Sequence, residues 1–317
     1  MDSPRQLVDL VRRTASQPMP SAVKILAKEI LGRHGDAVQA VLFYGSCLRA
    51  GNDLDGIVDL YVLVDSYRAA YGCSISASLN KLLPPNVFYL EVPFENRRVR
   101  SKYAILSMVD FQSGTSPVRF HSYFWARFAQ PTALAHVRND EIARKIYDAM
   151  AQAVLTFVAR VLPQMITPFC ARDLWQRGLL LSYRAELRAE RPEKIVRLFD
   201  AASDYYEQAT RIAARGLPFP IECLQAETPA TYRVGLSAWI RWSNRWQWRF
   251  RIWLGKMLSV LRLSKGLLTF RGGIDYILWK IERHSGVKVE VSPRLRKLPM
   301  LGVCITFWRL FRRGAFH

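Results

Sequence analysis

The stretch from residue 41 to residue 65 constrains the fold more than any other part of the sequence. An apolar run ends at Tyr44 and leads into Gly45 and Ser46, and after a polar turn a second apolar run carries one acidic residue, Asp59. Short β-branched and aromatic runs bounded by Gly, Asn and Asp are typical of strands. An Asp inside a buried strand is costly unless a metal or hydrogen bonds satisfy it. The stretch therefore predicts a strand-turn-strand unit that carries a site.

The residue types of this unit suit the binding of a nucleoside triphosphate. Gly45 allows the backbone to approach a phosphate, and the Ser46 hydroxyl and nearby N–H groups can donate to phosphate oxygens. Asp59 would hold Mg²⁺, a hard cation that takes oxygen ligands. A strand, a Gly-Ser turn and an acid on the next strand form the core of a nucleotidyltransferase site. On pattern alone, a plain strand-turn-strand with one badly placed Asp explains these residues equally well.

The charge of the chain predicts an anionic partner. The formal net charge is +20 over 317 residues, which points to nucleic acid, a nucleotide or an acidic membrane surface. Residues 231–317 hold 18 Lys and Arg against 3 acids, and seven of the nine Trp. Trp and Arg together suit a lipid headgroup interface, where each cation contributes ~1 kcal/mol. A helical core with a basic outer face, or RNA or DNA binding, remains open for the same residues.

The rest of the sequence predicts an α+β fold. Besides the unit at 37–65, we expect helices at 1–36, 66–83, 139–162, 171–188, 192–215 and 238–284, and a strand at 87–92. The predicted domains are a nucleotidyltransferase-type mixed sheet domain at 1–130, a helical domain at 131–230 and a basic, Trp- and Arg-rich helical membrane-contacting region at 231–317.

Further stretches, in order along the chain, resemble the landmarks of one family. They are Tyr44-Gly45-Ser46 with Val58-Asp59-Leu60; Lys102-Tyr103-Ala104-Ile105, similar to Lys-Tyr-Gly-Val; residues 123–131, similar to Tyr-x-x-Gly-Arg-x-x-Lys-Pro; residues 182–196, similar to Ser-Tyr-x-Gly-Asp-x-Arg-Met, then Glu, then Pro-x-Lys-Val; and Lys265-Gly266-Leu267-Leu268-Thr269. Together they resemble the mitochondrial translocator-maintenance type of phosphatidate cytidylyltransferase, a CDP-diacylglycerol synthase of the nucleotidyltransferase superfamily with bacterial relatives.

The resemblance implies an enzyme on a membrane surface that makes CDP-diacylglycerol from CTP and phosphatidic acid with Mg²⁺ and releases pyrophosphate. It implies catalytic roles for Asp59, Glu186 and Lys102, with Asp59 and Glu186 as metal ligands, and substrate contacts from Tyr44, Gly45, Ser46, Tyr103, Arg127, Arg188 and Lys194. Alternatives stay open for three of these residues: Tyr103 could fill core, Arg127 could be the buried partner of an acid, and Glu186 could be a helical Glu paired with a nearby Arg. A phosphate monoester needs no general base, so the five His are expected to be structural or exposed.

The sequence also departs from the family pattern. Glu186 stands in place of an Asp, Ala185 and Ala104 in place of Gly, and Gln130 in place of a Lys. General nucleotidyltransferases place two acids on the second strand, whereas Asp59 stands there alone. These changes indicate a divergent, bacterial branch.

The expected partners are CTP, phosphatidic acid and an anionic membrane surface, with no stable nucleic-acid partner and no predicted oligomeric state. The N-terminus has no apolar signal core, and no apolar run reaches the ~18 uncharged residues that a membrane span needs. We therefore expect a peripheral protein on the cytoplasmic face of a bacterial inner membrane, or alternatively on the matrix side of the mitochondrial inner membrane. The alternative functions are nucleotidyl transfer to another acceptor, or non-catalytic binding of membranes or nucleic acid.

Overall fold

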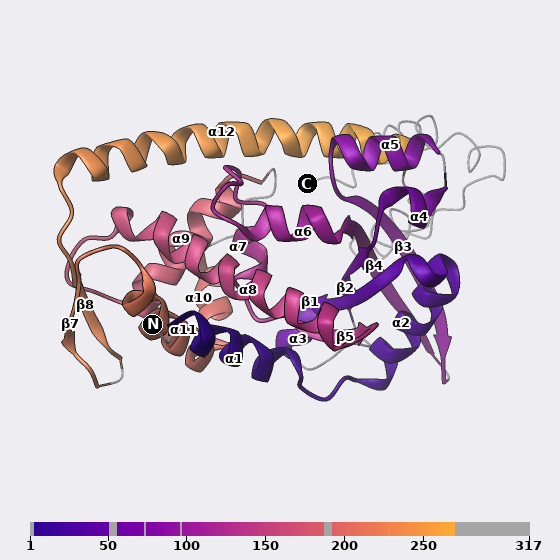
Figure 1. The fold of residues 1–317 in the computed structure, drawn as a ribbon, viewed down its shortest axis with the longest axis horizontal. Coiled ribbons are helices and arrows are strands. Elements are labelled where there is room, and N and C mark those ends of the chain that lie inside the picture. The colour runs from indigo at the N-terminus through magenta and orange to yellow at the C-terminus, as the bar shows by residue number, and fades with distance from the viewer. Residues whose placement is uncertain are drawn as a thin grey trace, which may run out of the picture.

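Five strands form one mixed sheet in the computed structural model, which describes residues 3–50, 56–72, 74–95, 97–186, 192–227 and 229–269 (Figure 1). The strands are β1 (Val38–Tyr44), β2 (Ile57–Val64), β3 (Asn86–Phe94), β4 (Arg97–Ser107) and β5 (Ala133–Val137), in the order β3-β4-β2-β1-β5. β2 and β4 run parallel, and the other three pairings are antiparallel. The strands predicted on either side of the Gly-Ser turn are confirmed as β1 and β2.

Helices flank the sheet and extend well beyond it. They are α1 (Ser3–Ala15), α2 (Ser21–His34), α3 (Ser46–Ala50), α4 (Tyr67–Tyr71), α5 (Ile75–Leu82), α6 (Met108–Thr115), α7 (Trp125–Phe128), α8 (Asp140–Val161), α9 (Ala171–Arg184), α10 (Pro192–Asp200), α11 (Ser203–Gly216) and α12 (Ala238–Thr269), with the 3₁₀ turns η1 (Gly35–Ala37) and η2 (Leu162–Gln164). Three short strands, β6 (Phe169–Cys170), β7 (Ile221–Gln225) and β8 (Thr231–Val234), form a second sheet. In Figure 1 the larger sheet lies at one end, the helices α8 to α11 lie beside it, and α12 runs along the whole length.

The predicted helices are mostly confirmed. The segments expected at 139–162 and 171–188 correspond to α8 and α9, and the segment expected at 192–215 is divided into α10 and α11. α12 confirms the helix expected from residue 238, although its continuation to residue 284 lies outside the described residues. The α+β class, with a mixed sheet followed by a helical region, is confirmed.

Side chains on the strands alternate between two buried cores. On β2, Tyr61 and Leu63 point to the core shared with the helices α7, α8 and α9, whereas Leu60 and Val62 point to the core shared with α2. Asp59 lies two residues before Tyr61 and so projects from the same face. The site therefore has to form between the sheet and the helical layer.

The domain boundary expected at residue 130 is wrong. β5 lies beyond it and pairs with β1, so the sheet includes a strand from the segment that we expected to be helical. α1 packs against α8 and α11, and one buried core continues from Leu7 through Tyr61 to Trp248. A strand of five residues directly before a long helix is too short to show a clear alternation of apolar and polar residues, which explains why the sequence did not predict it.

One face of α12 packs on the rest of the molecule. The indole Nε1 of Trp248 donates to the carbonyl oxygen of Arg160 at 3.0 Å, and Nε of Arg251 donates to the carbonyl oxygen of Phe120 at 2.7 Å. Trp248 and Arg251 are both buried. Among the described residues, no helix combines the length and the apolar character needed to cross a membrane.

The close packing of α9 on α8 gives a stability prediction. Gly178 lies against Phe157 and Val161, and a methyl group on it would lie 2.8 Å from Cε1 of Phe157 and 2.7 Å from Cγ2 of Val161. Phe157 stacks on Trp175 and has little room to move. We expect Gly178→Ala to lower the free energy of unfolding by about 1–3 kcal/mol in urea titrations.

The matched control for this substitution is Gly32→Ala in α2, where a Cβ meets nothing within 4 Å. There the better helix propensity of Ala is expected to raise the free energy of unfolding by up to about 1 kcal/mol. Equal effects at the two positions would contradict the close contact between α8 and α9.

Candidate active site

A row of three side chains crosses the sheet on the face toward the helical layer. The register places Tyr44 of β1 opposite Asp59 of β2, and Asp59 opposite Lys102 of β4. Nζ of Lys102 lies 3.3 Å from Oδ1 of Asp59, and both side chains are partly exposed. The acid that the sequence placed in a strand is therefore satisfied by a neighbouring cation and faces a cavity.

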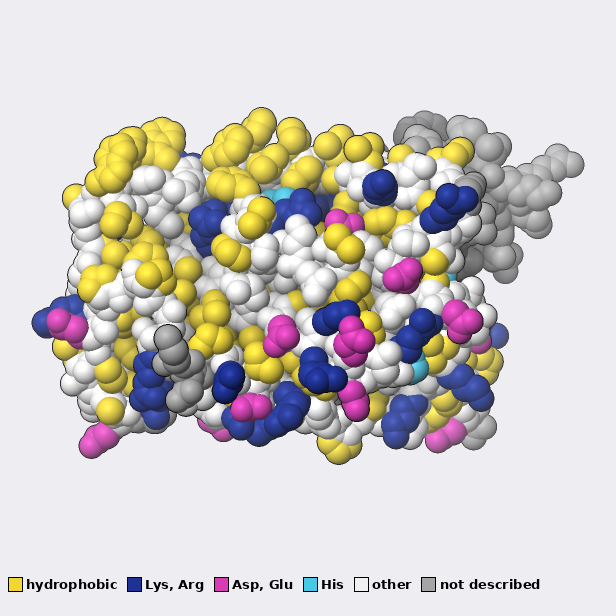
Figure 2. All heavy atoms as spheres, viewed as in Figure 1, with side chains coloured by type: hydrophobic (Ala, Val, Ile, Leu, Met, Phe, Trp, Pro, Cys, Tyr) yellow, Lys and Arg dark blue, Asp and Glu magenta, His cyan; other side chains and the backbone are white. Residues whose placement is uncertain are grey.

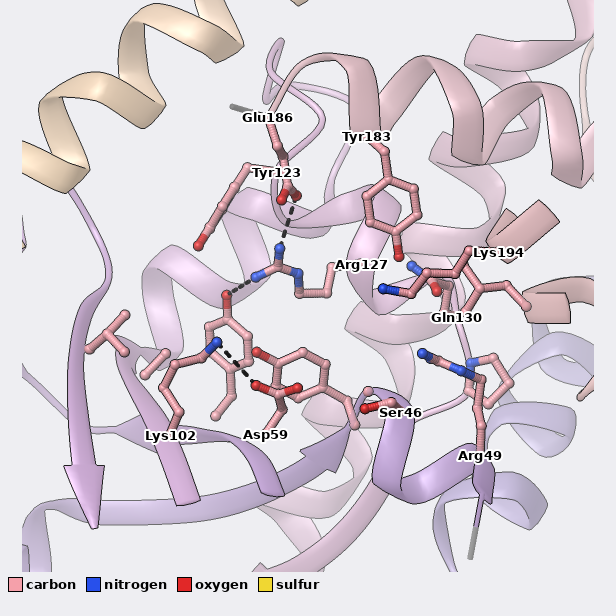
Figure 3. A pocket seen from close by; sticks show the side chains of 17 residues that line it. Ser46, Arg49, Asp59, Lys102, Tyr123, Arg127, Gln130, Tyr183, Glu186 and Lys194 are labelled. Carbon is pink, nitrogen blue, oxygen red and sulfur yellow. Dashed lines mark hydrogen bonds and ion pairs between the residues drawn. The ribbon is translucent and has the colours of Figure 1, made fainter. Parts of the chain in front are cut away.

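The backbone turns sharply where β1 ends. Gly45 has a φ of 90°, a conformation that residues with a Cβ rarely adopt. A Cβ at this position would lie 2.7 Å from Oδ2 of Asp59, so the absence of a side chain lets the strand end approach the carboxylate. Ser46 begins α3, and Arg49 in the same short helix lines the same cavity (Figure 3). The predicted role of Gly45 in a close backbone approach is consistent with this geometry.

Arg127 connects the sheet to the helical layer. Its Nη1 donates to the hydroxyl of Tyr61 on β2 at 3.0 Å, and its Nη2 donates to Oε1 of Glu186, just beyond α9, at 2.9 Å. The side chains of Arg127 and Glu186 are only 20% and 29% exposed, so this ion pair is largely shielded from water. The alternative that Arg127 is the partner of an acid is therefore confirmed.

The surroundings of Arg127 favour negative charge. Burial by itself lowers the pKa of Arg127, but Tyr61, Tyr123 and Glu186 outweigh burial and hold this pKa well above its ordinary value. Two guanidinium groups lie against the ring of Tyr123, Arg127 at 4.5 Å and Arg262 at 4.0 Å from the ring centre. Burial by itself raises the pKa of Tyr123, but these two cations outweigh it, so the pKa of Tyr123 is lowered.

These side chains line one cavity of about 550 Å³ (Figure 3). Sites for small molecules commonly measure roughly 300–1,000 Å³, so a nucleotide is of suitable size. The charged residues that line the cavity are Arg49, Lys102, Arg127 and Lys194, with Asp59 and Glu186. In Figure 3, Arg49 and Lys194 lie on the side of the cavity opposite Lys102. The cavity therefore presents an excess of positive charge on two sides, which suits a chain of phosphate groups.

The carboxylates fit a metal only in part. Within the ranges that the structure describes, no group of three His, Cys, Asp or Glu side chains is placed to hold a metal ion. Mg²⁺ commonly binds one or two protein carboxylates together with substrate phosphates, and Asp59, which faces the cavity, fits as a single ligand. Glu186 does not fit as its partner, because Arg127 lies between the two carboxylates and occupies Oε1 of Glu186 (Figure 3). The expectation that Asp59 and Glu186 together bind one ion is corrected accordingly.

The expected substrate contact from Tyr103 is wrong. Tyr103 is buried in the core shared with α2, stacks on Phe88, and its hydroxyl lies 3.4 Å from Nε2 of His34. It follows Lys102 directly on β4, and consecutive residues of a strand point to opposite faces, so the two cannot reach the same cavity. The alternative that Tyr103 fills core is confirmed.

The structure brings together most of the other predicted residues. Tyr44, Gly45, Ser46, Asp59, Lys102, Arg127, Glu186 and Lys194 all line the cavity. Arg188 lies outside the described residues, so its predicted contact with phosphate stays a prediction.

Several residues that line the cavity were not assigned a role from the sequence. Arg49 follows Ser46 at helical spacing, and Tyr61 follows Asp59 at strand spacing, so both could have been found from the expected secondary structure. Tyr123, Gln130 and Tyr183 belong to the stretches that carry the family resemblance, and all three line the cavity.

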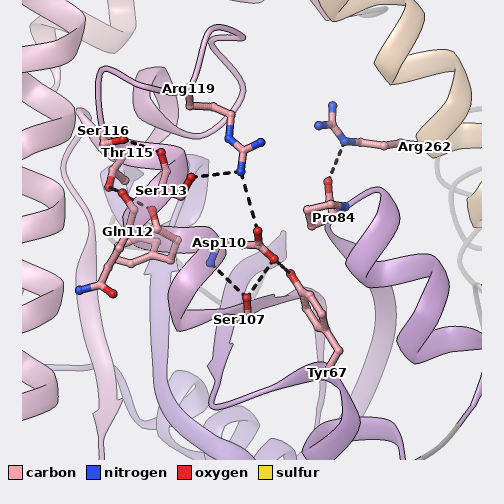
Figure 4. Close-up of polar contacts among 11 residues, drawn as sticks. Tyr67, Pro84, Ser107, Asp110, Gln112, Ser113, Thr115, Ser116, Arg119 and Arg262 are labelled. Carbon is pink, nitrogen blue, oxygen red and sulfur yellow. Dashed lines mark hydrogen bonds and ion pairs between the residues drawn. The ribbon is translucent and has the colours of Figure 1, made fainter.

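A polar network around Asp110 holds the loop that leads into α7 (Figure 4). Asp110 accepts hydrogen bonds from the hydroxyls of Tyr67 at 2.6 Å and Ser107 at 2.9 Å. Arg119 lies 3.8 Å from Asp110 and donates to the hydroxyl of Ser113 at 3.2 Å. The network ties this loop to α4 and α6 and so fixes one wall of the cavity.

α12 reaches the same wall. Its Arg262 rests on the ring of Tyr123, which lines the cavity. Next to Tyr123, His121 is largely buried, and its pKa is lowered to about 3 by burial, with smaller effects from Arg262, Arg119 and Arg251. His121 therefore stays neutral at ordinary pH, which agrees with the structural role that we expected.

Comparisons with known proteins leave the family open. No family model matches the chain, and no curated protein matches it. Among solved structures, the chain is similar to a nucleotidyltransferase-like protein from Exiguobacterium sibiricum 255-15, with 13% sequence identity, 92% of this chain and 91% of that chain covered, and a TM-score of 0.26. A TM-score this low carries no argument, so the fold class rests on the strands and helices described above. The resemblance to phosphatidate cytidylyltransferases stays a prediction.

The neutral state of His121 predicts a pH dependence of stability. The unfolded chain binds a proton at His121 below about pH 6.5, whereas the folded chain resists protonation down to about pH 3. The unfolded state is therefore favoured as the pH falls through this window. We expect His121→Gln to remove about 1–2 kcal/mol of the stability loss between pH 7 and pH 5 in urea titrations.

The control for this measurement is His136→Gln. His136 is less buried, and its pKa is lowered by burial and by Arg138. The change in pH dependence should therefore be smaller than at His121. An unchanged pH profile in His121→Gln would show that His121 is not held neutral in the folded protein.

The shielded ion pair gives a second prediction. In a double-mutant cycle with Arg127→Ala and Glu186→Ala, we expect a coupling free energy of about 1–3 kcal/mol, because each single variant leaves the other charge enclosed without its partner. The matched pair is Arg33 and Glu29, which has the same separation of 2.9 Å but is 44% exposed on both sides. There we expect less than about 0.5 kcal/mol. Similar couplings for the two pairs would argue against a shielded pair at Arg127.

Proposed function

We propose that this chain is a nucleotidyltransferase that transfers the cytidylyl group of CTP to phosphatidic acid, giving CDP-diacylglycerol and pyrophosphate. The observation that carries the proposal is the glycine bend of Gly45 and Ser46 packed directly against the Asp59–Lys102 pair, inside a cavity with cations on two sides. The choice of CTP and phosphatidic acid is supported by the ordered sequence motifs that resemble phosphatidate cytidylyltransferases.

The cavity can hold the triphosphate between its two cationic sides. Ser46 and Arg49 lie at the bend, Lys194 lies across from Lys102, and these groups can donate to phosphate oxygens. Asp59 sits next to the bend, where its carboxylate would otherwise repel a phosphate chain. The fit test above therefore assigns Asp59 to Mg²⁺, which supplies positive charge to the triphosphate when it is bound.

The transfer itself is an in-line displacement. An oxygen of the phosphatidic acid phosphate forms a bond to the α-phosphorus of CTP, and the bond from that phosphorus to the oxygen bridging to the β-phosphate breaks. Pyrophosphate leaves with the electron pair. Negative charge builds on the non-bridging oxygens, and Lys102 and Arg127 are fixed cations in the same cavity that can stabilise it. A phosphate monoester is already ionised near neutral pH, so the attacking oxygen needs no general base.

Arg127 has a positioning role in this proposal. Its guanidinium is held by Tyr61 and Glu186 before any substrate arrives, so its direction is set in advance. A preset charge costs no reorganisation during the reaction, which is the usual source of electrostatic catalysis. Glu186 then acts through Arg127 and not on the substrate.

The second candidate function is nucleotidyl transfer to a different acceptor. Ser46, Arg49, Lys102 and Lys194 suit phosphate groups in general, and this chemistry does not select one acceptor. A screen of acceptors with all four nucleotides separates the two candidates. In the first, the protein is peripheral to a membrane, on the cytoplasmic face in a bacterium.

The test of the proposed function is incorporation of labelled CTP into a lipid fraction, which should require phosphatidic acid and Mg²⁺. We expect Asp59→Asn to lower this activity at least about 100-fold, because it removes the carboxylate at the bend and leaves a side chain of similar size. Asp65→Asn is the matched control: it makes the same change on an exposed residue directly after β2. Lipid labelling by Asp59→Asn at the control rate would reject the assignment of Asp59.

A further inference from the structure

A continuous row of large apolar side chains lies exposed along α12. Its members recur at intervals of three and four residues and therefore share one side of the helix: Trp239, Trp242, Trp246, Phe250, Trp253, Met257, Val260 and Leu261, each at least 40% exposed. We call this set the α12 ridge. Figure 2 shows apolar side chains standing out along the edge of the molecule that α12 forms in Figure 1.

The ridge does not contribute to the core of the chain. The core-facing side of α12 is a different one, where Asn244, Trp248 and Arg251 are buried and bonded to the carbonyl oxygens of Arg160 and Phe120. The ridge rings contact one another instead: Trp239 stacks on Trp242 with ring centres 4.9 Å apart. Exposed apolar patches larger than a few hundred Å² are rare on monomeric soluble proteins and mark interaction surfaces.

The charge beside the ridge selects the partner. α12 contains no Asp or Glu, and Arg245, Arg249 and Lys256 are exposed on it next to ridge residues. The guanidinium of Arg249 rests on the ring of Trp246 at 4.8 Å. A partner therefore has to offer an apolar layer bordered by negative charge.

We propose that the α12 ridge docks flat on the surface of a phospholipid bilayer that contains anionic lipids. Trp and Phe side chains would enter the headgroup region, and the flanking cations would meet lipid phosphates, as in interfacial helices that bury one apolar face. From Trp239 to Leu261 the ridge extends over roughly 33 Å at the rise of an α-helix, which a planar surface can cover in full. A second copy of this chain fits less well, because two ridges face to face would bring their flanking cations together.

Docking in this orientation would also place the bilayer next to the candidate active site. Arg262 of α12 rests on Tyr123, and Tyr123 lines the cavity, so the helix that meets the lipid also supports a wall of the site. In this respect the inference rests on the proposed function, since a phosphatidic acid acceptor would be delivered at that surface. The docking surface itself is argued from α12 alone.

The test measures binding of the full chain to vesicles of phosphatidylcholine with and without phosphatidylglycerol, by co-sedimentation. The variant changes Trp242→Gln, Trp246→Gln and Trp253→Gln together, and its matched control changes the same three residues to Phe. Because only the first variant removes apolar surface, we expect it to lower the partition coefficient at least about tenfold, while the Phe variant stays within about threefold of wild type. Leu224→Gln, an exposed apolar residue on β7, should leave binding unchanged.

A second arm tests the charge. Arg245→Glu with Lys256→Glu should lower binding to the phosphatidylglycerol vesicles by more than about tenfold and have little effect on vesicles without it. Arg215→Glu, an exposed residue of α11, is the control for a single change of the same kind. Far-ultraviolet circular dichroism and binding of Mg·CTP should be unchanged in every variant, because none of these residues lines the cavity.

The possible results separate the explanations. Wild-type protein that ignores both kinds of vesicle, or a Gln variant that binds them as wild type does, would overturn the inference. A wild-type dimer that the Gln variant converts to a monomer, without vesicle binding, would assign the ridge to a second copy and also overturn it. Vesicle binding that depends on the ridge, in a protein that transfers nothing from CTP, would support the docking surface and reject the proposed function.

Discussion

The contacts of Arg127 are the interaction on which the geometry of the site depends. This one side chain, from the short helix α7, bonds to Tyr61 on the central strand β2 and to Glu186 beyond α9, and it stacks on Tyr123. These partners are 59 to 66 residues away in the sequence, apart from Tyr123. The guanidinium therefore fixes the distance between the sheet and the helical layer, and the cavity is the space that remains between them. Because an enclosed cation is costly without partners, the same contacts that shape the cavity also hold Arg127 in one position.

The alternation of side chains along the strands decides which residues can act in this cavity. Asp59 and Tyr61 share one face of β2, and Lys102 and Ala104 share the matching face of β4, so the register brings these four side chains to the same side. The sequence was sufficient to predict β1, β2 and the acid between them, because apolar runs bounded by Gly and Asp are unusually clear there. It also contained the information that excludes Tyr103, since two adjacent strand residues cannot both face one cavity. That information can be used only once β4 is recognised as a strand.

Other parts of the structure could not be derived from the sequence, for physical reasons. β5 is a strand because it pairs with β1, and its own five residues show no pattern that distinguishes it from the start of α8. The partner of Glu186 is set by tertiary packing: its place in the motifs suggested a metal ligand, whereas the fold brings Arg127 between it and Asp59. Local sequence predicts elements, and it does not predict which charge from a distant element lies next to a given carboxylate.

α12 shows the same limit in its clearest form. Trp239, Trp242, Trp246, Trp248 and Trp253 all lie within it, and all five contribute to the same high content of Trp and Arg. Four of them are more than half or about half exposed, whereas Trp248 is 2% exposed because it inserts beside Trp125 and bonds to the end of α8. The cations divide likewise, since Arg251 is buried between aromatic rings and Arg249 is exposed on the outer side. Composition could indicate an interfacial helix, but only the packing separates the side that completes the core from the side that is left for a partner. The basic and aromatic character of this segment therefore has two physical origins, and only the outer set of residues bears on what the chain binds.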